Sequence, residues 1–356
     1  MRCSIAKTML TLLSGRRSAI LLIVSTLGIA SPAWAGGRQV KIDNGVLHVT
    51  VDLPDPVNGA YRGTRFDWSG VIQSLSYAGH DYYGPWFTAT DPTVHDFVFS
   101  GDRIIAGPCS AITGPVEEFV SGDSALGYDG AAPGGTFVKI GVGVLEKPSD
   151  APYDNYHLYR IVDGGRWTVR PGPQSVTFEQ RILDPHSGYG YVYEKTLRLI
   201  PGRPEMVIEH SLRNTGRQTI DTDVYDHNFL VLDHRTIGPD FVITLPFAVH
   251  VPKPVNAALG EIDGNTIRYR RELQGHEDFA ADLRGFGPAA KDYDIRIENA
   301  RAGAGMRVQG DHPLAKLELW SIRTIIAMEP FIHISIAPGE AFHWQYRYEY
   351  YSIPAR

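Results

Sequence analysis

The sequence predicts an all-β protein built as a large antiparallel β-sandwich. Apolar and polar residues alternate with a period of two along most of the chain, as in strands that bury one face. The 37 Gly and 24 Pro suit many short strands joined by tight turns, and no convincing amphipathic helix is present. The strand pattern continues without a linker over residues 36–356, which favours one domain, although two smaller β-domains would also fit.

Residues 1–35 have the features of a secretory signal peptide. A basic segment with Arg2, Lys7, Arg16 and Arg17 precedes the apolar run SAILLIVSTLGIA and the site Ala33-Trp34-Ala35. The apolar run is shorter than the roughly 20 residues of a membrane span, so cleavage after Ala35 is favoured over an anchor. We therefore expect a periplasmic or secreted protein that does not insert into the membrane after cleavage.

The remaining chain is acidic. The whole chain has a formal net charge of −6, and the leader carries four basic and no acidic residues, which leaves −10 for the rest. Such a chain is a poor candidate for nucleic-acid binding. Cys109 is the one cysteine outside the leader, so no internal disulfide is expected.

Individual strands can be predicted in chain order. Residues 40–53 contain an Asn44-Gly45 pair between two alternating runs, which predicts a hairpin. Three further strands are expected within residues 175–214. In the last strand Phe342, Trp344, Tyr346, Tyr348 and Tyr350 fall on one face.

Polar residues inside two apolar strands are the first candidates for chemistry. Asp226, His227 and Asn228 stand in a row in VYDHNFLVLDH, and His is the side chain best suited to proton transfer near neutral pH. A polar pair at a sheet edge would explain them equally well.

Glu329 lies between Met328 and Pro330 in an apolar run. It could serve as a general base or as the partner of an arginine. We expect Pro330, which cannot donate to a ladder, to interrupt this strand.

A third cluster, YRGTRFDWSG at residues 61–70, has the mixture that binds sugars. Arg65 offers donors, Asp67 an acceptor and Trp68 a flat face, although an Arg–Asp pair at a strand start would look the same. Glu117 and Glu118 in GPVEEF and the aromatic run YYGPWF at residues 82–87 would add to the same cleft.

Common cofactor and metal motifs are missing from the sequence. It has no P-loop, no G-x-G-x-x-G after a strand, no H-E-x-x-H, no C-x-x-C and no G-x-S-x-G elbow. We therefore expect no cofactor and no metal. A Ca²⁺ site using Asp223 and Asp226 remains an alternative, although two acids alone do not make a site.

The three polar segments together resemble aldose 1-epimerases, the galactose mutarotase-like proteins. NTGRQTIDTDVYDHNFL is similar to their catalytic-His strand, MEPFIHISIAPGEAFHWQYRYEY to their ending, and YRGTRFDWSGVIQSLSYAGHDYYG to their start. The resemblance implies a very large antiparallel sandwich, with His227 as general acid, Glu329 as general base and Arg65 as a sugar-binding residue. An earlier substrate-binding His in an H-G-G-type segment is missing, and GPVEEF stands roughly in its place.

The resemblance implies a sugar as partner and cofactor-independent interconversion of anomers as the reaction. An ionised Glu329 would accept the O1 proton while a protonated His227 delivers one to the ring oxygen, with the pair on neighbouring strands. We expect Arg65, Asp67, Trp68, Glu118 and Asn228 to contact the sugar. A carbohydrate-binding protein without catalysis is the alternative, as is a lyase or glycosidase pairing Glu329 with Glu117 or Glu118.

Overall fold

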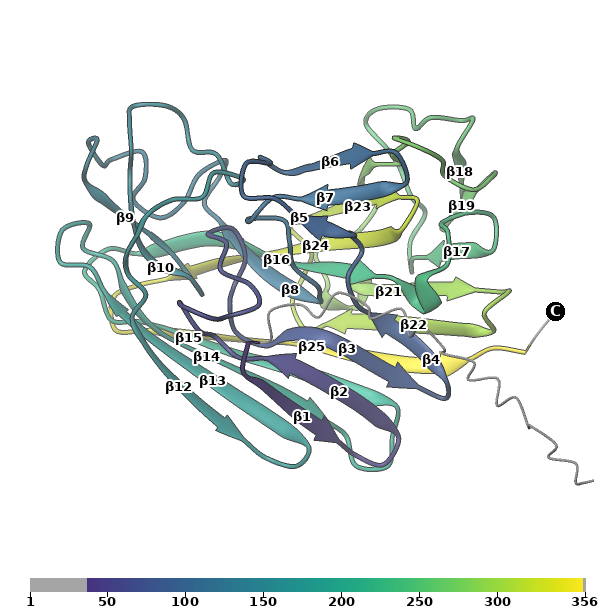
Figure 1. Ribbon diagram of the computed structural model, residues 1–356, viewed down its shortest axis with the longest axis horizontal. Coiled ribbons are helices and arrows are strands. Elements are labelled where there is room, and N and C mark those ends of the chain that lie inside the picture. Colours follow the sequence, from purple (N-terminus) through teal and green to yellow (C-terminus); the bar gives the residue numbers. More distant parts are fainter. Residues whose placement is uncertain (1–36, 355–356) are drawn as a thin grey trace, which may run out of the picture. The chain divides into compact units, whose positions relative to one another are not determined.

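The computed structural model describes residues 37–354, in which β-strands are the dominant secondary structure (Figure 1). The only helical elements of this region are two 3-10 turns, η1 (Leu232–His234) and η2 (Ala290–Asp292). The predicted all-β class is confirmed, whereas the predicted signal peptide lies outside the described residues. Among residues 37–354, no helix has the length and apolar character needed to cross a membrane.

The largest sheet has ten antiparallel strands. Its spatial order is β12 (Arg166–Pro171), β13 (Ser175–Leu183), β14 (Gly190–Leu199), β15 (Glu205–Asn214), β25 (Ala341–Ser352), β22 (Ala304–Gly310), β21 (Asp294–Asn299), β17 (Phe241–Thr244), β19 (Thr266–Tyr269) and β18 (Gly260–Asp263). The final strand β25 lies in the middle of this sheet, beside β15 and β22. As predicted, its aromatic residues at positions 344, 346, 348 and 350 are buried on one face.

A five-stranded antiparallel sheet forms the second layer of the sandwich. Its order is β20 (Ala281–Leu283), β23 (Lys316–Ile322), β24 (Ile325–Ile336), β16 (Ile220–Leu230) and β8 (Val116–Val120). Val224, Leu230 and Met328 of this sheet join one apolar core with Trp344 and Tyr348 of the ten-stranded sheet. Alternate residues of the same strands face the other way, towards a second apolar cluster.

Three smaller sheets complete the fold. Their orders are β1 (Gln39–Asp43), β2 (Leu47–Asp52), β3 (Val71–Tyr77) and β4 (His80–Tyr83); β11 (Ile161–Asp163), β10 (Gly143–Glu146) and β9 (Thr136–Lys139); and β5 (Ala89–Thr90), β7 (Arg103–Ala106) and β6 (Phe97–Ser100). The predicted hairpin is present as β1 and β2, and Gly45 in its turn has a φ of 83°. The short β5–β7 pair is parallel, in contrast to the antiparallel pairing expected throughout.

Candidate active site

Two neighbouring strands bring His227 and Glu329 together. β16 pairs with β24 in an antiparallel register that sets Asn228 opposite Met328, and the same register sets His227 directly opposite Glu329. His227 Nε2 lies 3.3 Å from Glu329 Oε1, and the two side chains are 5% and 12% exposed. The expectation that these residues occupy neighbouring strands on one face is therefore met.

Pro330 does not end its strand. β24 continues through Pro330, which lies opposite Leu317 of β23. On the side of β24 that pairs with β16, the paired residues nearest to Pro330 are Met328 and Phe331. The predicted interruption is thus corrected to a local gap in one ladder, because a proline removes only its own N–H donor.

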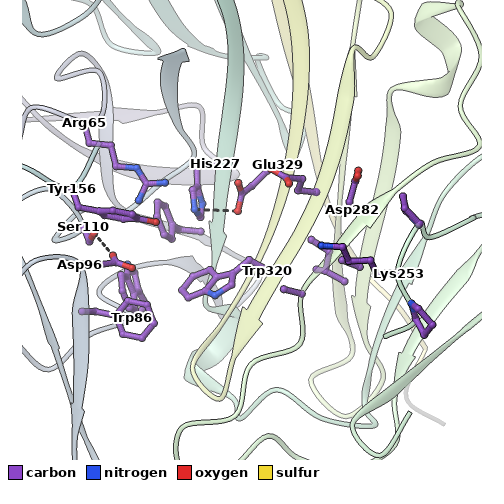
Figure 2. Close-up of a pocket in the computed structure, with 18 residues that line it drawn as sticks. Arg65, Trp86, Asp96, Ser110, Tyr156, His227, Lys253, Asp282, Trp320 and Glu329 are labelled. Carbon is purple, nitrogen blue, oxygen red and sulfur yellow. Dashed lines mark hydrogen bonds and ion pairs between the residues drawn. The ribbon is translucent and has the colours of Figure 1, made fainter. Parts of the chain in front are cut away.

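The pair lies in a cavity of about 710 Å³ above the outer face of the five-stranded sheet (Figure 2). Its lining is rich in aromatic and acidic side chains. The lining residues are Arg65, Trp86, Asp96, Phe97, Ser110, Tyr156, His227, Phe229, Pro252, Lys253, Pro254, Ala280, Ala281, Asp282, Glu318, Leu319, Trp320 and Glu329. A cavity of this size, apolar in part and with convergent polar groups, is typical of a small-molecule site.

Buried partners hold Arg65 in place at the edge of the cavity. Its Nε donates to Glu118 Oε2 at 2.6 Å, and its Nη2 donates to Tyr225 Oη at 3.0 Å. The guanidinium carbon also lies 4.4 Å from the ring centroid of Phe66 and 4.7 Å from that of Tyr156. These contacts fix a cation beside His227 and Glu329 before any ligand arrives.

The environment places the proton of the reactive pair on the carboxyl group. Burial raises the pKa of Glu329 to about 8, and the nearby Glu318 and Glu118 add to this rise against Arg65 and Lys316. Burial and the charge of Arg65 lower the pKa of His227 well below its ordinary value. Both shifts favour a neutral carboxyl group beside a neutral imidazole, rather than the expected ionised Glu329 and protonated His227.

A second polar cluster lies between the two large sheets, where β8 of the five-stranded sheet meets β14 and β15 of the ten-stranded sheet. Lys195 of β14 forms ion pairs with Glu117 and, at 3.6 Å, with Asp67, and it donates to the carbonyl of Ser69 at 2.9 Å. The carboxylate of Glu117 also accepts a hydrogen bond from His210 Nε2 at 2.8 Å. All of these side chains are buried, so Lys195 compensates carboxylates that water cannot reach.

Several solved structures that are similar to this chain carry related descriptions. One is the galactose mutarotase related enzyme from Lactobacillus acidophilus, with 13% identity, coverage of 88% of this chain and 98% of that chain, and a TM-score of 0.50. A candidate aldose 1-epimerase from Escherichia coli K12 has 13% identity, coverage of 89% and 100%, and a TM-score of 0.53. The aldose epimerase homologue from C. elegans has 13% identity, coverage of 90% and 100%, and a TM-score of 0.51.

The chain has the galactose mutarotase-like fold. At 13% sequence identity, these similarities show that the fold is shared and nothing more. No protein-family model matches the sequence, and no curated protein matches it. The chain is thus a divergent example of the galactose mutarotase-like sandwich.

Four of the five residues expected to contact a sugar do not line the cavity of the galactose mutarotase-like sandwich. Asp67 and Asn228 face the interior, where Asp67 accepts from Tyr193 at 3.1 Å and Asn228 donates to the carbonyl of Met328 at 3.0 Å. The expectation of direct sugar contact is corrected for these two residues, because neither lines the cavity.

Trp68 and Glu118 also do not line the cavity. Trp68 is buried and donates its Nε1 to the carbonyl of Gly63 at 2.8 Å. Glu118 is fully buried and bridges Arg65 to Lys139, whose Nζ lies 3.1 Å from Glu118 Oε1. Their expected sugar contacts are likewise corrected, and Arg65 remains as the lining residue among the five.

The residues suggested for a glycosidase pair and for a Ca²⁺ site are not arranged for either role. Glu117 and Glu118 face Lys195 and Arg65 respectively, so neither can form a glycosidase pair with Glu329 across the cavity. Asp223 and Asp226 lie on opposite faces of β16, because they are three residues apart in a strand. Within residues 37–354, no group of three or more His, Cys, Asp or Glu is arranged to hold a metal ion.

Several lining residues were missed by sequence reasoning. Glu318 and Trp320 alternate with buried leucines in KLELWSI, a pattern that could have marked them as facing out of the core. Asp96, Tyr156 and Lys253 come from irregular segments that fold back over the sheet, and nothing in their local sequence predicts this.

Proposed function

We propose that this protein is a carbohydrate-active enzyme of the aldose 1-epimerase type, which interconverts the anomers of a reducing sugar. The observation that carries the proposal is the His227–Glu329 pair, 3.3 Å apart in a cavity lined by aromatic side chains. Structural neighbours described as aldose epimerase homologue and galactose mutarotase related enzyme support it. Export after cleavage at Ala35 remains a prediction.

The proposed reaction needs one proton donor and one proton acceptor at the same time. The His227 imidazole accepts the proton of the O1 hydroxyl while the Glu329 carboxyl group gives its proton to the ring oxygen. The bond between C1 and the ring oxygen breaks, and the aldehyde forms. Rotation about C1–C2 and reclosure, with both protons returned, gives the other anomer. The pair thus offers one acidic proton, on Glu329, and one free acceptor nitrogen, on His227, which are the two groups that this exchange requires.

Arg65 has a supporting part in this proposal. Its guanidinium group is fixed by Glu118 and Tyr225, and it lowers the proton affinity of both reactive groups through its charge. A hydroxyl or ring oxygen placed over the pair would also lie near this cation. Arg65 therefore favours the state in which negative charge develops on a sugar oxygen during ring opening.

The test is polarimetry on freshly dissolved α-glucose and α-galactose. The purified protein is expected to shorten the approach to anomeric equilibrium in proportion to its concentration. A rate equal to the uncatalysed rate for both sugars, with binding of either sugar seen by calorimetry, would favour the non-catalytic carbohydrate-binding alternative.

The pH profile of kcat/KM tests the protonation states of the free enzyme. We expect kcat/KM to fall as the pH rises through about 8, because the Glu329 carboxyl group then loses the proton that it donates. On the acid side, activity should persist below pH 6.5, since the pKa of His227 is lowered and the imidazole stays neutral there. A profile that falls below about 6.5, the ordinary His value, and is flat through 8 would contradict this assignment.

A further inference from the structure

The floor of the cavity continues beyond the reactive pair. Glu329 lies opposite Glu318 of β23, and Glu318 lies opposite Asp282 of β20. His227, Glu329, Glu318 and Asp282 therefore form a row across four adjacent strands, all lining one cavity. Three strand spacings make this row about 14 Å long, which is longer than a single pyranose ring.

The reactive pair stands at one end of this row. On the far side of His227 the next position is Val116 of β8, which is buried and is not part of the lining. Figure 2 shows Arg65 and Tyr156 to one side of the pair, and Asp282 and Lys253 to the other. The arrangement suits a ligand that reacts at its terminal ring and extends in one direction, over β23 and β20.

The extension has the groups that bind sugar rings. Trp320, two residues from Glu318 on the same face of β23, is half-buried and lines the cavity next to His227, with ring centroids 6.1 Å apart. Asp282 accepts from Arg284 through Oδ2 at 2.7 Å, while its buried Oδ1 accepts no hydrogen bond from the described residues. An aromatic face beside the carboxyl groups of Glu318 and Asp282 matches the C–H face and the hydroxyl groups of a sugar.

The charges of this extension select against anions. Glu318 is paired with Lys316 at 2.8 Å and Asp282 with Arg284, so neither basic residue is left to bind a phosphate or a carboxylate of a ligand. Arg65, at the other end, is already engaged by Glu118. Lys253 also lines the cavity, together with the carboxyl groups of Asp96, Glu318 and Asp282. Because these acceptors outnumber the lysine, the extension offers little to an anionic ligand, and a neutral saccharide fits best.

We propose that the cavity binds a neutral reducing disaccharide, or the reducing end of a longer neutral oligosaccharide. C1 of the reducing ring lies over His227 and Glu329, and the next ring lies over Glu318, Trp320 and Asp282. This inference rests on the proposed anomer interconversion and adds the substrate class.

The experiment compares glucose with maltose, cellobiose and lactose, all of which present glucose as the reducing ring. Anomer exchange of each sugar is measured by saturation transfer between its anomeric protons, with the full-length protein at neutral pH. One or two additional hydrogen bonds from the second ring are expected to raise kcat/KM of the best disaccharide about tenfold over glucose. Glucose as good as or better than all three disaccharides would overturn the inference.

Variants of the extension separate this inference from the proposed function. Trp320→Ala and Asp282→Ala should each reduce the advantage of the disaccharide over glucose to about twofold or less, the loss expected when one net hydrogen bond or ring contact is removed. Asp263→Ala, exposed at the end of β18 and outside the cavity, is the matched control and should keep the advantage. If the wild-type protein exchanges the anomers of glucose and of the disaccharides with equal kcat/KM, the second-ring site is contradicted but the proposed function is not. If it accelerates anomer exchange of none of these sugars, the proposed function itself is contradicted. Cleavage of a disaccharide would contradict both.

Discussion

Replacing Glu329 by Gln is expected to slow anomer exchange by about 10²–10⁴-fold, the range that general acid–base catalysis supplies. Glutamine has the shape of the protonated carboxyl group and is neutral like it, so the buried environment that raises the pKa of Glu329 should accept the substitution. The amide cannot deliver a proton to the ring oxygen. Saturation-transfer NMR at pH 7 measures the exchange rate, and thermal unfolding checks that the fold is retained.

The companion substitution His227→Ala removes the proposed acceptor and should cause a loss in the same range. His333→Ala is its matched control, because His333 lies on β24 beyond the pair and is 55% exposed. Wild-type exchange rates in either active-site variant, in a protein that unfolds normally, would contradict the catalytic assignment.

Replacing Lys195 by Met is expected to lower the free energy of unfolding by about 3–5 kcal/mol, the cost of leaving a buried ion partner uncompensated. Lys195 is completely buried and faces Glu117 and Asp67 between the two large sheets. Methionine fills most of the same volume, so the loss would report charge rather than packing. Urea denaturation of the two proteins at pH 7 measures the difference.

Arg198→Met on the same strand is the control for the Lys195 substitution. Arg198 pairs with Glu209 at 2.7 Å, but both side chains are about two-fifths exposed. Exposed pairs contribute about 0–1 kcal/mol, so this variant should be nearly as stable as wild type. Similar losses for the two variants would show that burial does not govern the strength of these ion pairs.

The β-sandwich could be predicted from the sequence because strand alternation and turn residues are local signals. The alternation in β25 predicts correctly which aromatic residues are buried, and Asn44-Gly45 predicts the first turn. His227 and Glu329 could also be selected locally, since each is polar within an apolar strand. Their meeting depends on the register between β16 and β24, which no local pattern encodes; the family resemblance supplied it.

The sugar-contacting residues were harder to predict because residue type says little about direction. Trp68 and Trp320 are both tryptophans near polar residues, yet Trp68 packs into the core and Trp320 lines the cavity. Neighbouring Glu117 and Glu118 point to opposite faces of β8, each towards its own buried cation. The protonation of the pair also escaped prediction, because burial and Arg65 act through the folded environment.

A crystal structure of the Glu329→Gln variant with a bound reducing sugar would show whether His227 and Glu329 act on the anomeric centre. We expect the O1 hydroxyl and the ring oxygen to lie within hydrogen-bond reach, roughly 2.6–3.2 Å, of His227 Nε2 and of the residue 329 amide. A sugar bound with its anomeric carbon away from both residues, or bound outside this cavity, would contradict it.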